Sequence, residues 1–354
     1  MNNLLHLIQR KLIWILLGTY VLAAWMPQPG LAWRAWSVGK LMVGHSTLAL
    51  TFPTLVLAVL LWNAALSVDT RQLMVLRRHP SALIGGLLLN LALPLCFTVV
   101  VALGLSHWHS ADEMQSLLVA LAIIGSMPIA GASTAWAQSA EGNLGLSLGL
   151  VVLSTLLSPL TTPLGFHALA HMVSGGYAED LVELAGASTQ LFLVAVVVVP
   201  SIGGLLVHRL VGGRRLRPVL TPLRLVNVAA LLVLNYVNAA VSLPQMIRNP
   251  DWDYLALIFV CAFTLCGLAF AIGHMAGKLL RCGPAERISL MFGLGMNNNG
   301  SGLVLASSVL SGHPKVLLVI VAYNLAQQLV AGFVEHALVL QQRAMVRITG
   351  SESF

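Results

Sequence analysis

The stretch GLGMNNNGSGLV, residues 293–304, places three consecutive asparagines among four glycines, between apolar runs on both sides. Polar residues are scarce elsewhere, since 58% of the 354 residues are hydrophobic and only 9% are charged. A soluble domain is roughly half apolar and a quarter charged. The composition therefore predicts an all-α polytopic membrane protein, whose apolar segments cross the bilayer as helices of roughly 20 residues.

Ten apolar stretches are long enough to cross a membrane. They cover residues 12–33, 44–66, 82–105, 116–139, 143–172, 187–211, 220–243, 253–277, 286–311 and 315–342. The first stretch follows two basic residues and also resembles a signal peptide, but its removal would leave nine crossings. We therefore expect ten transmembrane helices.

The positions of Lys and Arg agree with this count. With the N-terminus in the cytoplasm, fifteen of the nineteen basic residues fall in cytoplasmic segments, including the cluster GGRRLRP at residues 212–218. The basic residues expected outside are Arg34, Lys40, Arg248 and Lys315. Both termini are expected in the cytoplasm. The net charge of +7 then reflects topology and contact with the lipid bilayer, and not nucleic-acid binding.

Two of the ten stretches are interrupted by small and polar residues. The fourth contains GSMPIAGASTAWAQSAEGN at residues 125–143, and the ninth contains GLGMNNNGSGLVLASSVLSGH at residues 293–313. Pro128 in the fourth and Asn298 in the ninth each lie 14 residues before a glycine. The interruptions therefore match in placement, although their residues differ.

Ten helices with matching breaks predict two inverted five-helix repeats, residues 1–178 and 179–354, as in many secondary transporters. A broken helix frees backbone groups, which membranes tolerate where the chain lines a cavity. The asparagines would then offer amide groups to an ion or substrate. The alternative is that they only form hydrogen bonds between helices. Two matching breaks favour a site.

The sequence resembles the bile acid:sodium symporter family. Residues 127–164, MPIAGASTAWAQSAEGNLGLSLGLVVLSTLLSPLTTPL, resemble that family's fourth and fifth helices, whose pattern runs close to CPGGTASN and then STLLSPLLTP. Residues 293–303 resemble its ninth-helix EVGMQNSGL, and residues 77–94 resemble its third helix with the preceding loop. The similarity covers about residues 45–330. It implies a core domain, a panel domain, and sodium sites where helices four and nine cross.

The resemblance assigns ion ligands and substrate contacts by position. The candidate sodium ligands are Asn90, Ser133, Thr134, Ser147, Met296 and Asn297. The candidate substrate contacts are Asn298, Asn299 and Gly300.

Gly293 is the main departure from the family, because it replaces the only acidic ligand, which two sodium sites share. Val151 likewise replaces a threonine. A buried cation without a counter-charge is costly, so two sodium sites built as in the family are not expected. A single, weaker site made of carbonyls, amide oxygens, Ser133 and Ser147 remains compatible with the sequence.

Other ionisable groups have both a functional and a structural interpretation. Glu335 and His336 are adjacent in the last helix, and such a pair can carry protons; proximity of Glu335 to Arg343 or water is the favoured interpretation. In SHWHSADE, His107, His109 and Asp112 have a spacing that metals use. Solvated neighbours of an interfacial tryptophan are favoured there.

Amide side chains also recur in two of the later helices. They are Asn227, Asn235, Asn238, Gln327 and Gln328. They either line a cavity or form hydrogen bonds between helices. Asn235 and Asn238 share one helix face, which favours a cavity.

The sequence therefore predicts a secondary transporter of small amphipathic organic anions, bile-acid-like or other carboxylates and sulfonates, that works by alternating access. Its coupling ion is Na⁺, or else it is a proton-coupled or uncoupled carrier on the same fold. No catalytic motif indicates an enzyme. A bacterial inner membrane is the expected location.

Overall fold

The structure is a computed structural model that describes residues 12–44, 46–68, 80–310 and 312–349. The side chains at 12, 13, 217, 221 and 343–349 lie outside this description. Among the described residues, six helical segments are long and apolar enough to cross a membrane. They are α5 (Pro80–Gly104), α8 (Leu144–Ala170), Ala187–Val211, Pro218–Arg248 of α12 (Gly213–Arg248), α13 (Trp252–Leu279) and Pro314–Gln342 of α16 (Pro314–Thr349).

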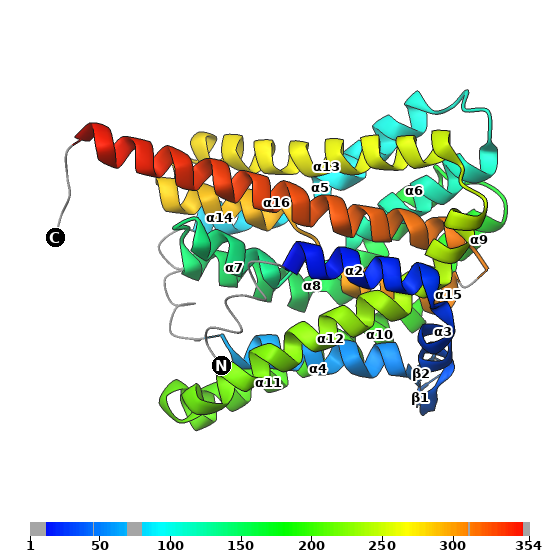
Figure 1. The fold of residues 1–354 in the computed structure, drawn as a ribbon, viewed down its shortest axis with the longest axis horizontal. Coiled ribbons are helices and arrows are strands. Elements are labelled where there is room, and N and C mark those ends of the chain that lie inside the picture. Colours follow the sequence, from blue (N-terminus) through cyan, green and yellow to red (C-terminus); the bar gives the residue numbers. More distant parts are fainter. Residues whose placement is uncertain (1–11, 45, 69–79, 311, 350–354) are drawn as a thin grey trace.

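The six segments coincide with the third, fifth, sixth, seventh, eighth and tenth predicted spans. The sixth consists of α10 (Ala187–Phe192), a π-helical stretch η2 (Leu193–Val198) and α11 (Val199–Val211). The chain is thus a multi-pass membrane protein, and the full count of ten crossings stays a prediction. The helices lie roughly along the long axis of the molecule (Figure 1). On α5, Ile84, Leu88 and Val100 are exposed, as expected for side chains in contact with lipid.

The first two predicted spans differ from the structure. The first is divided into α2 (Leu12–Trp25) and α3 (Pro27–Ala35), because the residue before a proline avoids the helical conformation. The prediction that residues 44–66 form one helix is wrong: β1 (Ser37–Val43) pairs antiparallel with β2 (Ser46–Thr51), and α4 (Phe52–Leu66) begins afterwards. Proline is tolerated only in the first turn of a helix, so α4 starts at Phe52, directly before Pro53.

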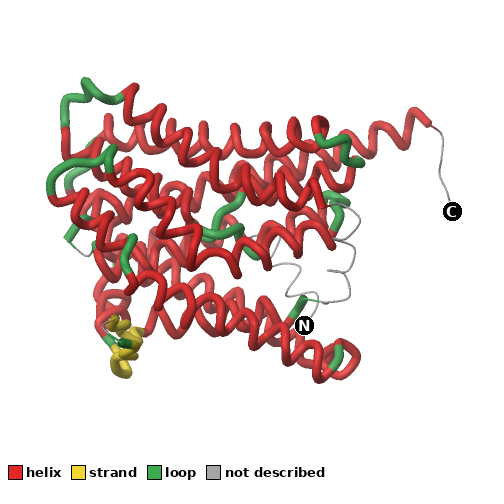
Figure 2. Tube along the Cα trace, turned by 180° about the vertical axis from the view of Figure 1, so that it is seen from behind, coloured by secondary structure: helices red, strands yellow, loops and turns green. Residues whose placement is uncertain are grey.

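The fourth and ninth predicted spans are both broken, as the sequence indicates. The fourth is α6 (Ala111–Ser126) followed by α7 (Ala132–Ser139), and the ninth is α14 (Pro284–Gly295) followed by α15 (Asn299–Val309). Figure 2 shows short non-helical segments in the middle of the bundle, away from the loops at its two ends. The helix α9 (Gly176–Leu184) lies before the sixth span.

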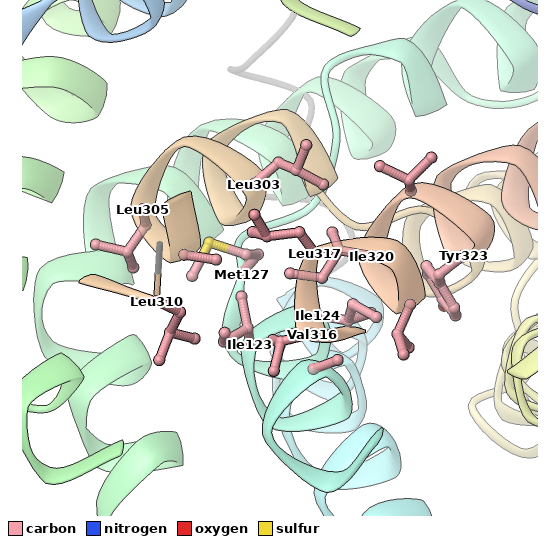
Figure 3. Packing of buried hydrophobic residues seen from close by; sticks show 14 of the residues in the cluster. Ile123, Ile124, Met127, Leu303, Leu305, Leu310, Val316, Leu317, Ile320 and Tyr323 are labelled. Carbon is pink, nitrogen blue, oxygen red and sulfur yellow. The ribbon is translucent and has the colours of Figure 1, made fainter. Parts of the chain in front are cut away.

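An apolar core surrounds the first break. Ile123, Ile124 and Met127 at the end of α6 pack with Leu303 of α15 and Leu317 of α16 (Figure 3). These side chains are at most 4% exposed. The interrupted backbone is therefore held in a closely packed surrounding, which fixes the polar groups next to it.

Candidate functional site

The two breaks are bonded to each other. Ile129 and Asn297 form an isolated antiparallel β-bridge. The Ala130 N–H donates to the Met296 carbonyl at 2.8 Å, and the Asn298 N–H donates to the Pro128 carbonyl at 2.8 Å. Pro128 and Asn298 are the two residues that occupy matching positions in the fourth and ninth predicted spans. Each break therefore satisfies backbone groups of the other at a depth where an unpaired group is costly.

The two breaks have different local causes. In the first, Met127 precedes Pro128 and is extended, with φ −75° and ψ 149°, as a residue before proline prefers. In the second, Met296 is extended without a proline, and the Asn298 Oδ1 accepts the Ser301 N–H at 3.2 Å. That hydrogen bond is an N-cap, which starts α15 as a new helix. Pro128 thus accounts for the end of a helix at the first break, whereas Asn298 starts a helix at the second.

Gln327 of α16 forms hydrogen bonds with the residues of the second break. This side chain is 1% exposed. Its Oε1 accepts the Asn297 N–H at 2.9 Å and the Asn299 Nδ2–H at 3.1 Å, and its Nε2 donates to the Asn297 carbonyl at 3.2 Å. Of the two interpretations left open by the sequence, hydrogen bonding between helices is the one that the structure shows for Gln327. Gln328 instead accepts the Trp136 Nε1–H at 3.3 Å.

The candidate ligands Asn90 and Asn297 are bonded to each other. The Asn90 Nδ2–H donates to the Asn297 Oδ1 at 2.9 Å, and the Asn297 Nδ2–H donates to the Ile124 carbonyl at 3.0 Å. Both asparagines are buried. The amide oxygen of Asn297 therefore already has a donor, which weakens it as an ion ligand.

Ser133 and Ser147 are in the opposite condition. They are 0% and 2% exposed, and neither hydroxyl oxygen has a hydrogen-bond partner among the described residues. They lie on α7 and α8, two helices that pack together. Buried hydroxyls are rarely left without a partner, so each of the two fits a bound cation or water. The Thr134 hydroxyl donates to the Gly131 carbonyl at 2.7 Å, and Met296 is fully buried, with its carbonyl bonded as above.

Gly293 is buried in α14, near this group of residues. A Cβ atom there would meet only Leu150 Cδ1, at 2.9 Å. That atom is the movable end of a side chain. A Cβ atom at this position therefore meets no backbone of a neighbouring element, only a side-chain end that can shift.

A groove reaches the breaks from one side. Its lining is mostly apolar and comes from α4, α8 and α11, and from both breaks. Leu61, Leu156 and Leu205 are among the apolar residues, and Thr134 and Asn298 are among the polar ones. Of the three candidate substrate contacts, only Asn298 lines this groove.

Asn299 and Gly300 line a second, smaller cavity. Asn235 and Asn238 of α12 also line it, as their shared helix face predicts. Asn324 of α16 joins them and donates to the Asn235 Oδ1 at 3.1 Å. The three candidate substrate contacts are therefore divided between two cavities. No sequence pattern singles out Asn324.

The comparisons with known proteins identify the family. The sequence model of the Sodium Bile acid symporter family matches residues 54–246, which is more than half of the chain. The chain belongs to this family. It is a secondary transporter, as the sequence predicts.

Two relatives from Bacillus subtilis (strain 168) are similar to most of the chain. The uncharacterized protein YbaS is 27% identical over 271 residues, which is 75% of this chain and 82% of YbaS. The uncharacterized sodium-dependent transporter YocS is 25% identical over 286 residues, which is 80% of this chain and 83% of YocS. The family match ends at residue 246, before the second break.

Three other polar residues that the sequence singles out, Glu335, His336 and Asn227, lie outside both cavities. Glu335 accepts a hydrogen bond from the Ser139 hydroxyl at 2.6 Å, so its partner lies on α7; the Arg343 side chain is outside the described residues. His336 is exposed. The Asn227 Oδ1 is buried without a partner among the described residues.

Proposed function

We propose that the protein carries small amphipathic organic anions across the bacterial inner membrane by sodium-coupled alternating access. The observation that carries this proposal is that two buried hydroxyls have no partner among the described residues: Ser133 in the first turn of α7, directly after the first break, and Ser147 in the first turn of α8. Unwound backbone with free oxygen atoms is the arrangement in which secondary transporters hold coupling ions.

The large groove supports an amphipathic organic anion as substrate. Its apolar lining suits a hydrocarbon body. At its inner end, Asn298 begins α15 and Gly131 begins α7, and both line the groove. A helix N-terminus favours negative charge, so the carboxylate or sulfonate of the substrate would face these two helix starts.

One sodium site fits the residues better than two. Ser133 and Ser147 keep hydroxyl oxygens without partners among the described residues, whereas the Asn297 Oδ1 already accepts a hydrogen bond from Asn90. Breaking the Asn90–Asn297 bond to bind a second cation would sacrifice a buried hydrogen bond, and no carboxylate lies at Gly293 to compensate the charge. The Thr134 hydroxyl and backbone carbonyls would complete the single site.

Alternating access requires two bodies that move against each other. In our proposal, the panel contains α2, α3, α4, α11 and α12, and the remaining long helices form the core. The groove lies between α4 and α11 on one side and α8 with the breaks on the other. This division would follow from inverted repeats of residues 1–178 and 179–354, with both termini in the cytoplasm.

Proton-coupled or uncoupled transport is the second candidate. Gly293 favours it, because the chain lacks the carboxylate with which the family holds sodium. Glu335 of α16, which accepts a hydrogen bond from Ser139 at the end of α7, would carry the proton. Transport that follows a pH gradient and ignores sodium would select this candidate.

Uptake into proteoliposomes tests the proposal. The reconstituted protein is given labelled amphipathic carboxylates and sulfonates under an inward Na⁺ gradient, an equal K⁺ gradient or a pH gradient. We expect accumulation with Na⁺ only. Leu156→Trp, which fills the groove, should reduce uptake at least tenfold. Leu160→Trp is the matched control, since Leu160 is one turn further along α8 and 64% exposed; equal activity of the two variants would exclude the groove as the binding site.

A further inference from the structure

Three metal-ligating side chains meet at one end of the bundle, outside the cavities described above. They come from two parts of the chain that are far apart in sequence: His109 and Glu113 at the start of α6, and Asp253 in the first turn of α13. One ligand atom of each lies within 4.8 Å of the other two. Of the three residues that the motif SHWHSADE offers, His107, His109 and Asp112, only His109 belongs to this cluster; its other members are Glu113 and Asp253.

The distances match the coordination of a transition metal. His109 Nε2 lies 3.1 Å from Asp253 Oδ2 and 3.7 Å from Glu113 Oε2. Two metal–ligand bonds of about 2.0–2.1 Å at a tetrahedral angle place their ligand atoms about 3.4 Å apart. The two distances lie on either side of that value, so an ion fits with small side-chain movements.

Glu113 is held in place before any ion arrives. Its side chain is 7% exposed, its Oε2 accepts the Trp108 Nε1–H at 2.9 Å, and Lys315 Nζ lies 3.8 Å from its Oε1. His109 and Asp253 are 61% and 55% exposed, which leaves an entry path. One fixed carboxylate with two accessible partners is a common plan for a metal site, because the fixed ligand sets the geometry.

Charge and hydrogen bonding also favour a cation. Lys315 offsets part of the charge of these carboxylates, since it is bonded to Asp112 at 2.8 Å and lies 3.8 Å from the Glu113 Oε1. Tyr254, which follows Asp253, is 1% exposed, and its hydroxyl has no partner among the described residues. A metal ion with three protein ligands carries water, and water is the kind of partner that this hydroxyl lacks.

We propose that His109, Glu113 and Asp253 bind a divalent transition-metal ion such as Zn²⁺, which joins the start of α6 to the start of α13. A nitrogen ligand with two carboxylates favours zinc-like ions over Ca²⁺, which prefers oxygen ligands only. The alternative is an ion pair of protonated His109 with its two neighbours, which needs no metal.

Calorimetric titration of the purified, tag-free protein with ZnCl₂ distinguishes the two. We expect one saturable site, with affinity reduced more than about tenfold in His109→Gln and in Asp253→Asn. His107→Gln is the matched control, because His107 contacts Ser106 and belongs to no such cluster among the described residues. Melting temperatures without metal show whether each variant is folded.

Three results would overturn the proposal. They are no saturable Zn²⁺ binding to the wild-type protein, equal binding by His109→Gln, or Ca²⁺ binding as tight as Zn²⁺ binding and independent of His109. The last would mean that the acidic groups attract cations without a defined site. Transport does not enter the measurement, so its outcome is independent of the proposed carrier function.

Discussion

At the scale of single residues, the three consecutive asparagines of the ninth span make different contacts. Asn297 is hydrogen-bonded to Asn90 and Gln327. Asn298 caps α15 and lines the groove, whereas Asn299 lines the second cavity. The sequence predicts that these residues serve a break. It does not predict which asparagine faces which side, because that depends on Gln327, a residue of another helix.

Replacing Gln327 by leucine should destabilise the protein by about 2–4 kcal/mol. The substitution leaves the Asn297 N–H and the Asn299 amide without their shared acceptor, and each buried unpaired group costs about 1–3 kcal/mol. Gln328→Leu, one residue further, loses only the 3.3 Å bond to Trp136. Thermal unfolding in detergent measures both, and equal melting temperatures would show that Gln327 does not hold the break.

Gly293→Glu should strengthen sodium binding. The carboxylate supplies the missing counter-charge, and the first atom of the new side chain, Cβ, meets only the movable end of Leu150. Tenfold tighter binding adds about 1.4 kcal/mol to the binding free energy. The melting temperature in NaCl, relative to KCl, should rise more than in the wild-type protein.

Gly293→Gln controls for this prediction, because it has nearly the same shape and no charge. A sodium effect of the same size in both variants would contradict an electrostatic role. Loss of folding in both would show that the position is too crowded, and not that the charge is irrelevant.

At the scale of elements, the sequence predicts most of the helices and both interruptions. It does so because apolar length and small, polar or proline residues act locally. The hairpin of β1 and β2 is missed, since STLALT is as apolar as a helix and its strand pairing depends on β1. Likewise, the hydrogen bonds between the two breaks join residues about 170 positions apart, roughly half of the chain, and no local pattern reports them.

Three helix starts are joined by one polar network, and this network predicts a pH dependence. Lys315 of α16 bonds to Asp112 of α6 at 2.8 Å, and Tyr177 of α9 donates to the same carboxylate at 2.6 Å. These partners, Lys315 first, lower the pKa of Asp112. Burial and then Asp112 raise the pKa of Tyr177 to about 12.

The signs of the two shifts define the pH range. A lowered carboxyl pKa stabilises the fold above the ordinary value of about 4, and this stabilisation is lost as the pH falls through the lower, folded-state pKa. The contribution of Tyr177 is present below about pH 10 and is lost between there and about 12. Asp112→Asn should therefore flatten the acid limb of melting temperature against pH. Glu179→Gln on exposed α9 should not, and an unchanged acid limb in Asp112→Asn would refute the network's role.

At the scale of the whole molecule, residues of both breaks line the groove that opens to one side of the bundle. Sodium bile acid symporter membership gives the protein class, and Gly131 and Asn298 of the two breaks both line the groove. From sequence alone, the candidate ligands form a single set. The structure separates them into residues with free oxygens and residues that satisfy each other, because only three-dimensional contacts show which hydroxyls and amides are already bonded.

The most direct test of this account compares melting temperatures in NaCl and in equal KCl for the purified protein. A ligand that binds only the folded state raises the melting temperature by mass action. We predict a sodium-specific rise in the wild-type protein that disappears in Ser147→Ala. The rise should persist in Ser158→Ala, a buried serine of the same helix whose hydroxyl is already bonded to the Thr155 carbonyl at 2.8 Å. No sodium-specific rise in the wild-type protein, or an equal rise in Ser147→Ala, would contradict the proposed site.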